Sequence, residues 1–261
     1  MMNYYRFKCF EKQSDLLHTV THRSMYHPYE FSLALHTGEK KEEILKNRKV
    51  LAASLLHEED LQSEKNLCFI VANQTHSDNI RIITKKETKG WTDLGDAIED
   101  CDALITKERG IILTILTADC VPILLYDSEK KVIAAVHAGW KGSKAGIVAK
   151  TVLRMKEMYA CEPENIMAGI APSIGRCCYE VGEEVAQHFF DRPESLKKKQ
   201  EKYMLDLPYI NKYQLLECGL KEEHIEMSDV CTACEVEHYF SYRKEQGCSG
   251  RFMSMIGMPE S

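Results

Sequence analysis

Residues 110–142, GIILTILTADCVPILLYDSEKKVIAAVHAGWKG, contain two apolar runs joined by a polar turn. The runs are Ile111–Tyr126, which is interrupted near Asp119–Pro122, and Val132–His137. The polar segment 127–131 between them is typical of a chain reversal. The pattern predicts an antiparallel hairpin at the centre of the fold.

This hairpin brings a cysteine and a histidine together. If Tyr126 pairs with Val132, then Val121 lies opposite His137, give or take one residue, and Cys120 is its cross-strand neighbour. Opposed residues of an antiparallel pair have Cα atoms about 4.5–5.5 Å apart. A thiolate and an imidazole at that distance can share one metal ion or one proton.

Two kinds of chemistry are consistent with Cys120 and His137. In one, an imidazole base activates a thiolate nucleophile, as in Cys-His hydrolases and transferases. In the other, the pair and a third ligand hold a tetrahedral metal ion whose fourth position is open. Asp119, next to Cys120, would orient a ligand histidine or act as a base. Spacing alone does not separate these interpretations from a purely structural pair.

A second cysteine motif, Cys231-x-x-Cys234 followed by His238, has the spacing expected of half a structural zinc site. A second pair at suitable spacing is missing from the sequence, since Cys248 is single. We therefore interpret these residues as buried free thiols. The motif also lacks the proline and the His-x-Glu of the zinc nucleobase deaminases, which excludes that fold.

The bulk composition of the 261-residue chain is 44% apolar and 28% charged, with a formal charge of −6. These values are typical of a globular protein, and the length suits one domain over residues 1–261. An acidic chain without a long basic block has no electrostatic attraction for nucleic acid or an anionic membrane. Eleven cysteines without a signal-like apolar N-terminus indicate reduced thiols in a cytoplasmic protein.

Strands and helices interleave without a strict strand-helix-strand rhythm, which predicts an α+β fold: a single layered domain whose mixed β-sheet, containing the central hairpin, is flanked by helices. Further strands are expected at 4–10, 31–35, 66–72, 80–83, 103–106, 166–170 and 252–256, and helices at 42–56, 143–159, 183–190 and 208–218. Ser143 is the expected N-cap of its helix, and Arg48 by itself indicates a solvated cation. The charged segment 191–203 is expected to be an exposed loop or a lid.

Five motifs follow one another along the chain. They are Asn73-Gln74-Thr75-His76, Thr117-Ala118-Asp119-Cys120-Val121-Pro122, Val136-His137-Ala138-Gly139-Trp140-Lys141-Gly142, Ala171-Pro172-Ser173-Ile174-Gly175 with Cys178-Tyr179-Glu180-Val181, and Phe240-Ser241-Tyr242-Arg243 before Gly250-Arg251. Together they resemble the ordered motifs of the laccase-domain family, whose members are also called polyphenol oxidase family proteins, purine nucleoside phosphorylases or peptidoglycan editing factors. The similarity spans nearly the whole chain.

The resemblance implies that His76, Cys120 and His137 bind one zinc ion, with copper as the alternative metal. It implies a purine nucleoside phosphorylase that acts on adenosine, inosine and methylthioadenosine with phosphate, and that deaminates adenosine as a side reaction. Cys120, His137 and Asp119 are then the expected catalytic residues. The protein would be a monomer or a homodimer.

Substrate contacts are implied at Arg48, Lys141 and Gln74. Arg48, Lys141 and the helix start after Gly142 are the expected phosphate contacts. The chain departs from the family pattern at Lys141, which replaces an arginine and loses its bidentate fork. It departs again at Ala34, where the family often has asparagine. These changes concern substrate preference more than the metal ligands.

Three other functions compete with this one. A copper-dependent polyphenol oxidase ordinarily needs several coppers, and the chain has no His-x-His cluster for further ones. A Cys-His hydrolase of peptidoglycan-related amides would use Cys120 as its nucleophile without a metal. A zinc-stabilised binding protein would lose stability on chelation and show no turnover.

Overall fold

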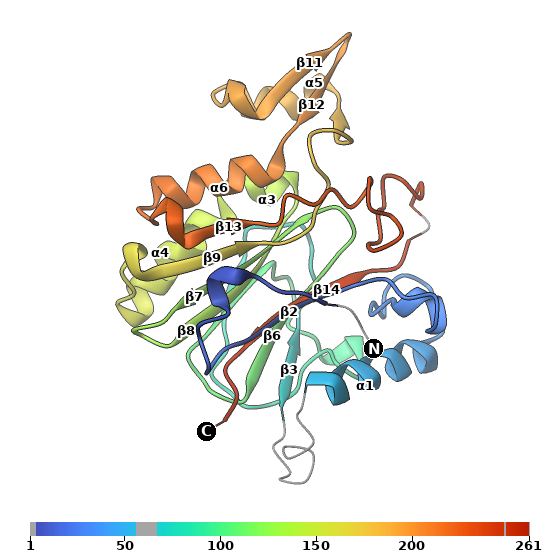
Figure 1. Ribbon diagram of the computed structural model, residues 1–261, viewed down its shortest axis with the longest axis vertical. Coiled ribbons are helices and arrows are strands. Elements are labelled where there is room, and N and C mark those ends of the chain that lie inside the picture. Colours follow the sequence, from blue (N-terminus) through green and yellow to red (C-terminus); the bar gives the residue numbers. More distant parts are fainter. Residues whose placement is uncertain (1–3, 56–66, 248, 261) are drawn as a thin grey trace.

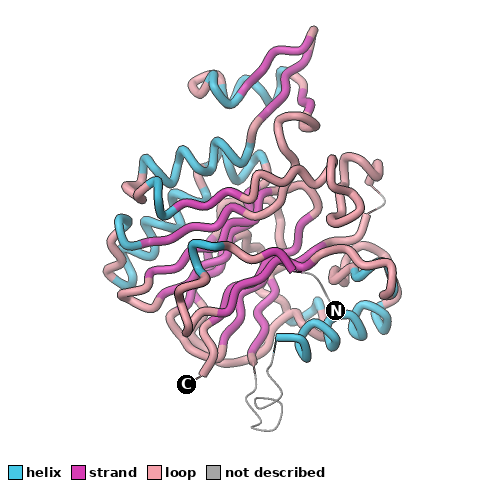
Figure 2. The backbone as a smooth tube through the Cα atoms, in the orientation of Figure 1, coloured by secondary structure: helices cyan, strands magenta, loops and turns pink. Residues whose placement is uncertain are grey.

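The computed structural model describes residues 4–55, 67–247 and 249–260. Two β-sheets pack against one another at the centre of the molecule, and helices lie outside them (Figures 1 and 2). Strands and helices are mixed along the chain. The predicted α+β class and its mixed, helix-flanked sheet are confirmed, although the strands divide among several sheets.

The larger sheet has the strand order β13-β9-β7-β8-β5-β4. The pairs β4–β5 and β13–β9 are parallel, and the other neighbours are antiparallel. Its strands are β4 (Ile80–Ile82), β5 (Ala103–Thr106), β7 (Val121–Asp127), β8 (Val132–Ala138), β9 (Ile166–Ile170) and β13 (Ile225–Met227).

The second sheet has the order β1-β2-β14-β6-β3, with β3 and β6 parallel. Its strands are β1 (Tyr4–Tyr5), β2 (Leu17–Thr21), β3 (Cys68–Val71), β6 (Ile111–Thr117) and β14 (Phe252–Gly257). A small third sheet has the order β10-β12-β11. It consists of β10 (Glu180–Val181), β11 (Leu196–Lys199) and β12 (Lys202–Leu205).

The helices are α1 (Lys41–Leu55), α3 (Trp140–Ala145), α4 (Ile147–Tyr159), α5 (Glu183–Ala186) and α6 (Leu207–Glu217). Apolar side chains of α4 and α6 pack on one face of the six-stranded sheet, whereas α1 packs through Leu51 on the outer face of the five-stranded sheet. Short 3₁₀ turns lie at Lys8–Phe10, Pro28–Phe31, Leu94–Asp96, Pro163–Asn165, Gln187–Phe189, Pro193–Ser195 and Glu222–His224. Within the described residues, no helix combines the length and the apolar character that a membrane crossing requires.

The predicted hairpin is confirmed as β7 and β8. Its register pairs Val121 with Ala138 and Pro122 with His137, one residue from the symmetric pairing and within the expected tolerance. The apolar run before the turn, however, is two strands: β6 belongs to the five-stranded sheet and β7 to the six-stranded sheet. The chain therefore crosses from one sheet to the other immediately before Cys120.

Both hairpin strands are buried on both faces, which explains their unbroken apolar sequence. Val132 and Ala134 face the helices, whereas Ile133 and Ala135 face the second sheet. Side chains alternate between the two faces of a strand, so His137 lies on the same face as Ile133 and Ala135. It consequently points into the space between the two sheets.

The segment after His137 differs from the predicted single helix. It forms α3 and α4, which are separated by Gly146 with φ +73°, a conformation that favours glycine. The N-cap is Gly139, and Ser143 is instead buried within α3, where its hydroxyl accepts a hydrogen bond from Asn211. The N-cap thus lies four residues earlier in the chain, and closer to His137, than predicted.

Two predicted segments have other structures. Residues 31–35 are not a strand, because Tyr29, Glu30 and Phe31 adopt φ values of 47°, 52° and 71°. Residues 191–203 contain the β11–β12 hairpin, which projects beside α5 at the top of Figure 1. The strand expected at 4–10 is limited to β1, and β2 was not predicted. The ends of the segments predicted at 42–56 and 66–72 lie outside the described residues.

Candidate metal centre

Three donor side chains converge where the chain crosses between the sheets. His76 lies in the loop after β3, Cys120 precedes β7, and His137 lies near the end of β8. Their ligand atoms all lie within 4.8 Å of one another, and His76 Nε2 is 3.8 Å from Cys120 Sγ. The structure therefore brings together the three residues expected to bind a metal.

Asp102 orients His137. It precedes β5 and lies opposite His137, because the neighbouring pair of the β5–β8 ladder is Ala103 with Val136. The Nδ1–H of His137 donates to Oδ1 of Asp102 over 2.7 Å, and the backbone N–H of His137 donates to the carbonyl of Asp102 over 2.7 Å. The Nε2 of His137 is left to act as the ligand atom, which is the usual arrangement of a metal-binding histidine.

The same carboxylate orders the loop that carries His76. The backbone N–H groups of Thr75, His76 and Ser77 donate to it over 3.2, 3.1 and 2.7 Å. His76 has φ +60°, which is uncommon for a residue with a Cβ. These bonds to the fully buried Asp102 hold the loop in that conformation.

Asp119 is bound to the C-terminal part of the chain. Its Oδ1 accepts from the Thr232 hydroxyl and its Oδ2 from the Arg243 backbone N–H, each over 2.7 Å. Its φ is +92°, and its carbonyl accepts from the Ile174 N–H. Asp102, and not Asp119, is therefore the carboxylate that orients a ligand histidine, while Asp119 anchors the segment that ends at Cys120.

The donors fit one metal ion. A Cβ at Gly139 would lie 3.0 Å from Cδ2 of His76 and 3.1 Å from Sγ of Cys120, so the glycine leaves the space these ligands occupy. Two imidazoles and one thiolate form a three-ligand set typical of catalytic zinc with an open fourth position. Copper is bound by the same donor types.

Charges around the site favour a Cys120 thiolate. Burial acts to raise the pKa of this thiol, but His137 and His76 outweigh it and hold the pKa at about 6. Burial acts to lower the pKa of His137, but the charge on Cys120 and the bond to Asp102 raise it to about 9. Burial acts to raise the pKa of Asp102, and its hydrogen bonds from His137 and Ser77 lower it to about 2. These interactions favour the thiolate form of Cys120, which is the form that binds a metal ion.

Arg48 has a structural position. Its side chain is 1% exposed, so the prediction of a solvated cation is wrong. Its Nε and Nη2 donate to the carbonyl of Leu33, and its Nη1 to those of Gly90 and Trp91. Because these carbonyls receive its donors, the geometry does not support Arg48 as a phosphate contact.

The other two expected substrate residues lie nearer the centre. Gln74, two residues before His76, exchanges two hydrogen bonds with the backbone of Leu116, which fixes the loop to the end of β6. Lys141 is exposed in the first turn of α3, with its Nζ 5.8 Å from the ring centre of Trp140. Gln74 is placed to position His76, and Lys141 is exposed two residues after the helix N-cap Gly139. Ala34 is buried.

A cleft of about 710 Å³ is connected to the centre through one of its lining residues, Arg251. Arg251 lines this cleft, and burial lowers the pKa of its guanidinium while the nearby charges of Cys120 and Asp119 act in the opposite direction. The cleft is also lined by Arg23, Tyr29, Glu30, His36, Glu39, Phe240 and Glu245. The cleft therefore offers aromatic faces and a cation, Arg251, that interacts electrostatically with Cys120.

Sequence reasoning missed Asp102 and assigned no role to Arg251. The signal for Asp102 was a single acidic residue directly before an apolar strand, and its meaning depends on the pairing of β5 with β8. Arg251 belonged to a recognised motif, but the motif does not show that it lies near Cys120.

Comparison with known proteins identifies the family. A family model described as multi-copper polyphenol oxidoreductase laccase matches residues 18–259. The chain belongs to this family. The purine nucleoside phosphorylase YlmD of Bacillus subtilis is 34% identical over 90% of this chain and 84% of that protein. An adenosine deaminase from an unknown prokaryotic organism is 34% identical over 72% of this chain and 74% of that protein.

The fold of this laccase-domain chain is shared with solved structures. The crystal structure of YlmD from Geobacillus stearothermophilus aligns with a TM-score of 0.88 and 29% identity, covering 98% of this chain and 96% of that chain. The resemblance drawn from the motifs is thereby confirmed. The names of its relatives support an enzyme of this family.

Proposed function

We propose that the protein is a metal-dependent purine nucleoside phosphorylase. It would cleave adenosine, inosine and methylthioadenosine with phosphate, and deaminate adenosine in a second reaction. The supporting observation is the convergence of His76, Cys120 and His137 in a chain whose relatives are named purine nucleoside phosphorylase and adenosine deaminase. Zinc is the proposed metal and copper the alternative.

His76, Cys120 and His137 would hold the ion through Nε2, Sγ and Nε2. When bound, it would supply a Lewis acid that polarises a substrate group or lowers the pKa of a water toward about 7. Asp102 fixes the ligand nitrogen of His137, so that the donors need little rearrangement. His76 is the exposed donor, and we place the substrate on its side of the centre.

Arg251 is the proposed phosphate-binding cation in place of Arg48. It is half-buried in the wall of the cleft, and a guanidinium can bind two phosphate oxygens at once. Its Nη1 donates to the carbonyls of Ser249 and Gly250, which fixes the plane of the group. Lys141 would supply a second, more mobile positive charge. The cleft volume lies within the range of small-molecule sites.

A cysteine hydrolase is the second candidate, because Cys120, His137 and Asp102 also have the order of a nucleophile, a base and an orienting carboxylate. Such an enzyme would act on peptidoglycan-related amides without a metal. Alkylation of Cys120 would abolish its activity, whereas a chelator would leave it intact.

A polyphenol oxidase is less well supported despite the family description. Among the described residues, metal-binding side chains gather in two groups, and only one of them contains histidine. Four-electron reduction of oxygen ordinarily draws on several coppers. One His₂Cys centre does not provide them.

Phosphate-dependent cleavage of inosine tests the proposal. Purified protein is incubated with inosine with and without phosphate, and hypoxanthine and ribose 1-phosphate are quantified by chromatography. The reaction is repeated after chelation and after zinc is restored. We expect product release that requires phosphate, disappears on chelation and returns with zinc. No release from inosine, adenosine or methylthioadenosine under any condition would overturn the proposal.

Two variants refine the assignment. His76→Ala should lose the ion of this centre and its turnover while remaining folded. Arg251→Met should raise the KM for phosphate without changing metal content. Arg109→Met is a matched control, because Arg109 is also partly exposed and pairs with the remote Asp15. An unchanged phosphate KM in Arg251→Met would remove Arg251 from the proposed phosphate site.

A further inference from the structure

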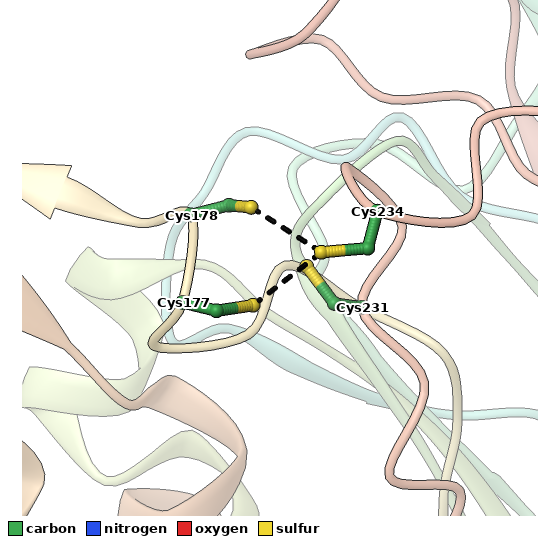
Figure 3. Close-up of side chains that lie close together, drawn as sticks. All are labelled: Cys177, Cys178, Cys231 and Cys234. Carbon is green, nitrogen blue, oxygen red and sulfur yellow. Dashed lines mark hydrogen bonds between the residues drawn. The ribbon is translucent and has the colours of Figure 1, made fainter.

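Four cysteines outside the His76 centre gather at one point (Figure 3). Cys177 and Cys178 lie in the loop before β10, and Cys231 and Cys234 lie in the turn after β13. Their sulfur atoms all lie within 4.8 Å of one another. The second pair that the sequence seemed to lack is therefore Cys177-Cys178. Cys231 and Cys234 are free thiols as expected, but they are not buried, since Cys231 is half-buried and Cys234 is exposed.

The sulfur spacing suits four ligands of one ion. Zinc bound tetrahedrally by four thiolates at about 2.3 Å separates the sulfurs by about 3.8 Å. Sγ of Cys234 lies 3.6 Å from that of Cys177 and 3.5 Å from that of Cys178. A disulfide would require about 2.0 Å. The observed distances are close to the first value and far from the second.

The backbone of both loops is shaped around the sulfurs. The Gly175 N–H donates to Sγ of Cys231 over 3.2 Å, and the Cys234 N–H donates to the carbonyl of Cys231 over 3.0 Å, which closes a tight turn. A Cβ at Gly175 would lie 3.4 Å from Sγ of Cys177 and 3.3 Å from Cβ of Cys231. The glycine allows the two loops to approach, and its N–H supports a sulfur ligand from outside the ligand set.

Hydrophobic burial does not explain this cluster. Cys177 and Cys234 are exposed, and Cys178 and Cys231 are half-buried. Four thiolates this close would repel one another without a cation between them. A set of four sulfur donors in tetrahedral spacing is typical of structural zinc.

We propose that Cys177, Cys178, Cys231 and Cys234 hold one structural Zn²⁺ ion. Binding replaces the thiol protons, which pass to solvent, with four zinc–sulfur bonds, and no oxidation state changes. Protein sulfurs fill every position of a tetrahedral ion, so this site stabilises the fold and does not bind substrate. It is separate from the His76 centre and does not depend on the proposed nucleoside chemistry.

The ion would join two loops that border the catalytic centre. Thr232, between Cys231 and Cys234, donates its hydroxyl to Asp119, the neighbour of Cys120. On the other loop, Cys178 is followed by Tyr179, whose ring lies 5.2 Å from the Arg243 guanidinium. The backbone N–H of Arg243 also binds Asp119. A metal at the four sulfurs would therefore hold the partners of Asp119 in place.

Metal stoichiometry tests this proposal. The full chain is purified in reductant, stripped of metal, saturated with Zn²⁺, freed of excess ion and analysed by mass spectrometry of the element. We expect two bound ions for the unaltered chain and one for Cys231→Ser/Cys234→Ser. Cys120→Ala should lose the other ion. Cys218→Ser, at a half-buried cysteine outside both groups, is the matched control and should keep two.

Substitution with Co²⁺ identifies the donors. Tetrahedral Co²⁺ absorbs through sulfur-to-metal charge transfer, and the band grows with the number of thiolates. We expect a strong band in the unaltered chain and in Cys120→Ala, and its loss in Cys231→Ser/Cys234→Ser. If that double variant does not fold, Co²⁺ titration of the unaltered chain still resolves a thiolate-rich site from the His76 centre.

Three results would overturn the proposal. The first is a single bound ion in the unaltered chain that Cys120→Ala removes. The second is a strong Co²⁺ band that survives in folded Cys231→Ser/Cys234→Ser. The third is an intact mass, measured without reductant, that shows the hydrogen loss of disulfides among these cysteines. None of these measurements uses nucleoside turnover, so failure here is distinct from failure of the proposed function.

Discussion

The two cysteine-containing centres are built in different ways. At the His76 centre, two donors lie at strand ends within the paired sheets, and buried Asp102 binds both His137 and the loop of His76. At the four-cysteine cluster, every donor lies in a loop, and the two loops are joined by a short backbone bridge between Ser173 and Cys231 and by the Gly175 N–H. The first centre is fixed by strands and a buried carboxylate, whereas the second is fixed by fewer bonds, all of them between loops.

This difference suggests separate roles for the two centres, one in catalysis and the other in stability. A preformed centre can leave one coordination position open, because the fold and not the ion holds its donors. Loops joined by one backbone bridge and four sulfurs would be stabilised further by an ion bound to those sulfurs. We therefore expect the first centre to control turnover and the second to control the stability of the loops around Asp119.

Exchange of ligands at each centre, one at the first and two at the second, is expected to give the largest effects. Cys120→Ala should reduce nucleoside turnover to background. Tm should change little, because the hydrogen bonds of Asp102 to His137 and to the His76 loop remain. Cys231→Ser/Cys234→Ser should lower Tm and retain part of the turnover. Thermal unfolding and inosine cleavage measured on both proteins, with Cys218→Ser as control, test the contrast. Equal losses of Tm in the two variants would show that the two centres do not differ in their contribution to stability.

Acid should lower the free energy of unfolding through His18, which belongs to neither centre. His18 Nε2 accepts the Phe7 N–H over 3.1 Å; burial, followed by the charge of Arg6, lowers its pKa from 6.5 to about 4. The unfolded chain binds this proton at higher pH, so the stability is complete above about pH 6.5 and lost as the pH falls toward 4, by about 3 kcal/mol.

Urea unfolding between pH 7 and pH 4 measures this contribution. His18→Gln should show a smaller decrease over that range, while both bound ions are retained at neutral pH. A pH dependence identical to that of the unaltered chain would assign the acid sensitivity to another group.

Asp102→Asn should weaken the first centre alone. Loss of the carboxylate that orients His137 is expected to lower metal affinity by about 10–100-fold, while the cysteine cluster keeps its ion. Asp127→Asn is the matched control, because Asp127 is equally buried but accepts N–H bonds in the hairpin turn. Competition with a chromophoric chelator measures both affinities. Similar weakening in both variants would point to general destabilisation instead.

Thr232→Val should have the smallest effect. It removes the hydroxyl that links the cysteine loop to Asp119, at a cost of about 1 kcal/mol in stability. We expect kcat/KM to fall a few-fold, because the segment before Cys120 loses an anchor. Thr151→Val removes a comparable buried bond, to Ile147 in α4, and should cost stability without affecting turnover. Equal kinetics in the two variants would separate the cluster from catalysis.

Several features could be predicted because they depend on neighbours along the chain. The β7–β8 hairpin, β5 and β9 were recognisable as short apolar runs beside turns, and α1 as a helix with apolar spacing. The motifs identified the family and hence the donors His76, Cys120 and His137. Arg48 was misjudged, because its charge indicates solvent while its carbonyl partners, at Leu33, Gly90 and Trp91, are remote in sequence.

The order of the strands in the sheets is not encoded in any one segment, since it results from packing between distant apolar faces. That order places Asp102 opposite His137 and moves the chain between sheets before Cys120. The meeting of Cys177 with Cys234, 57 residues apart, likewise depends on two loops that emerge side by side. Local pattern thus determined the elements and the donor types, whereas tertiary packing decided which charged and sulfur groups share a site, because that choice depends on contacts between remote segments.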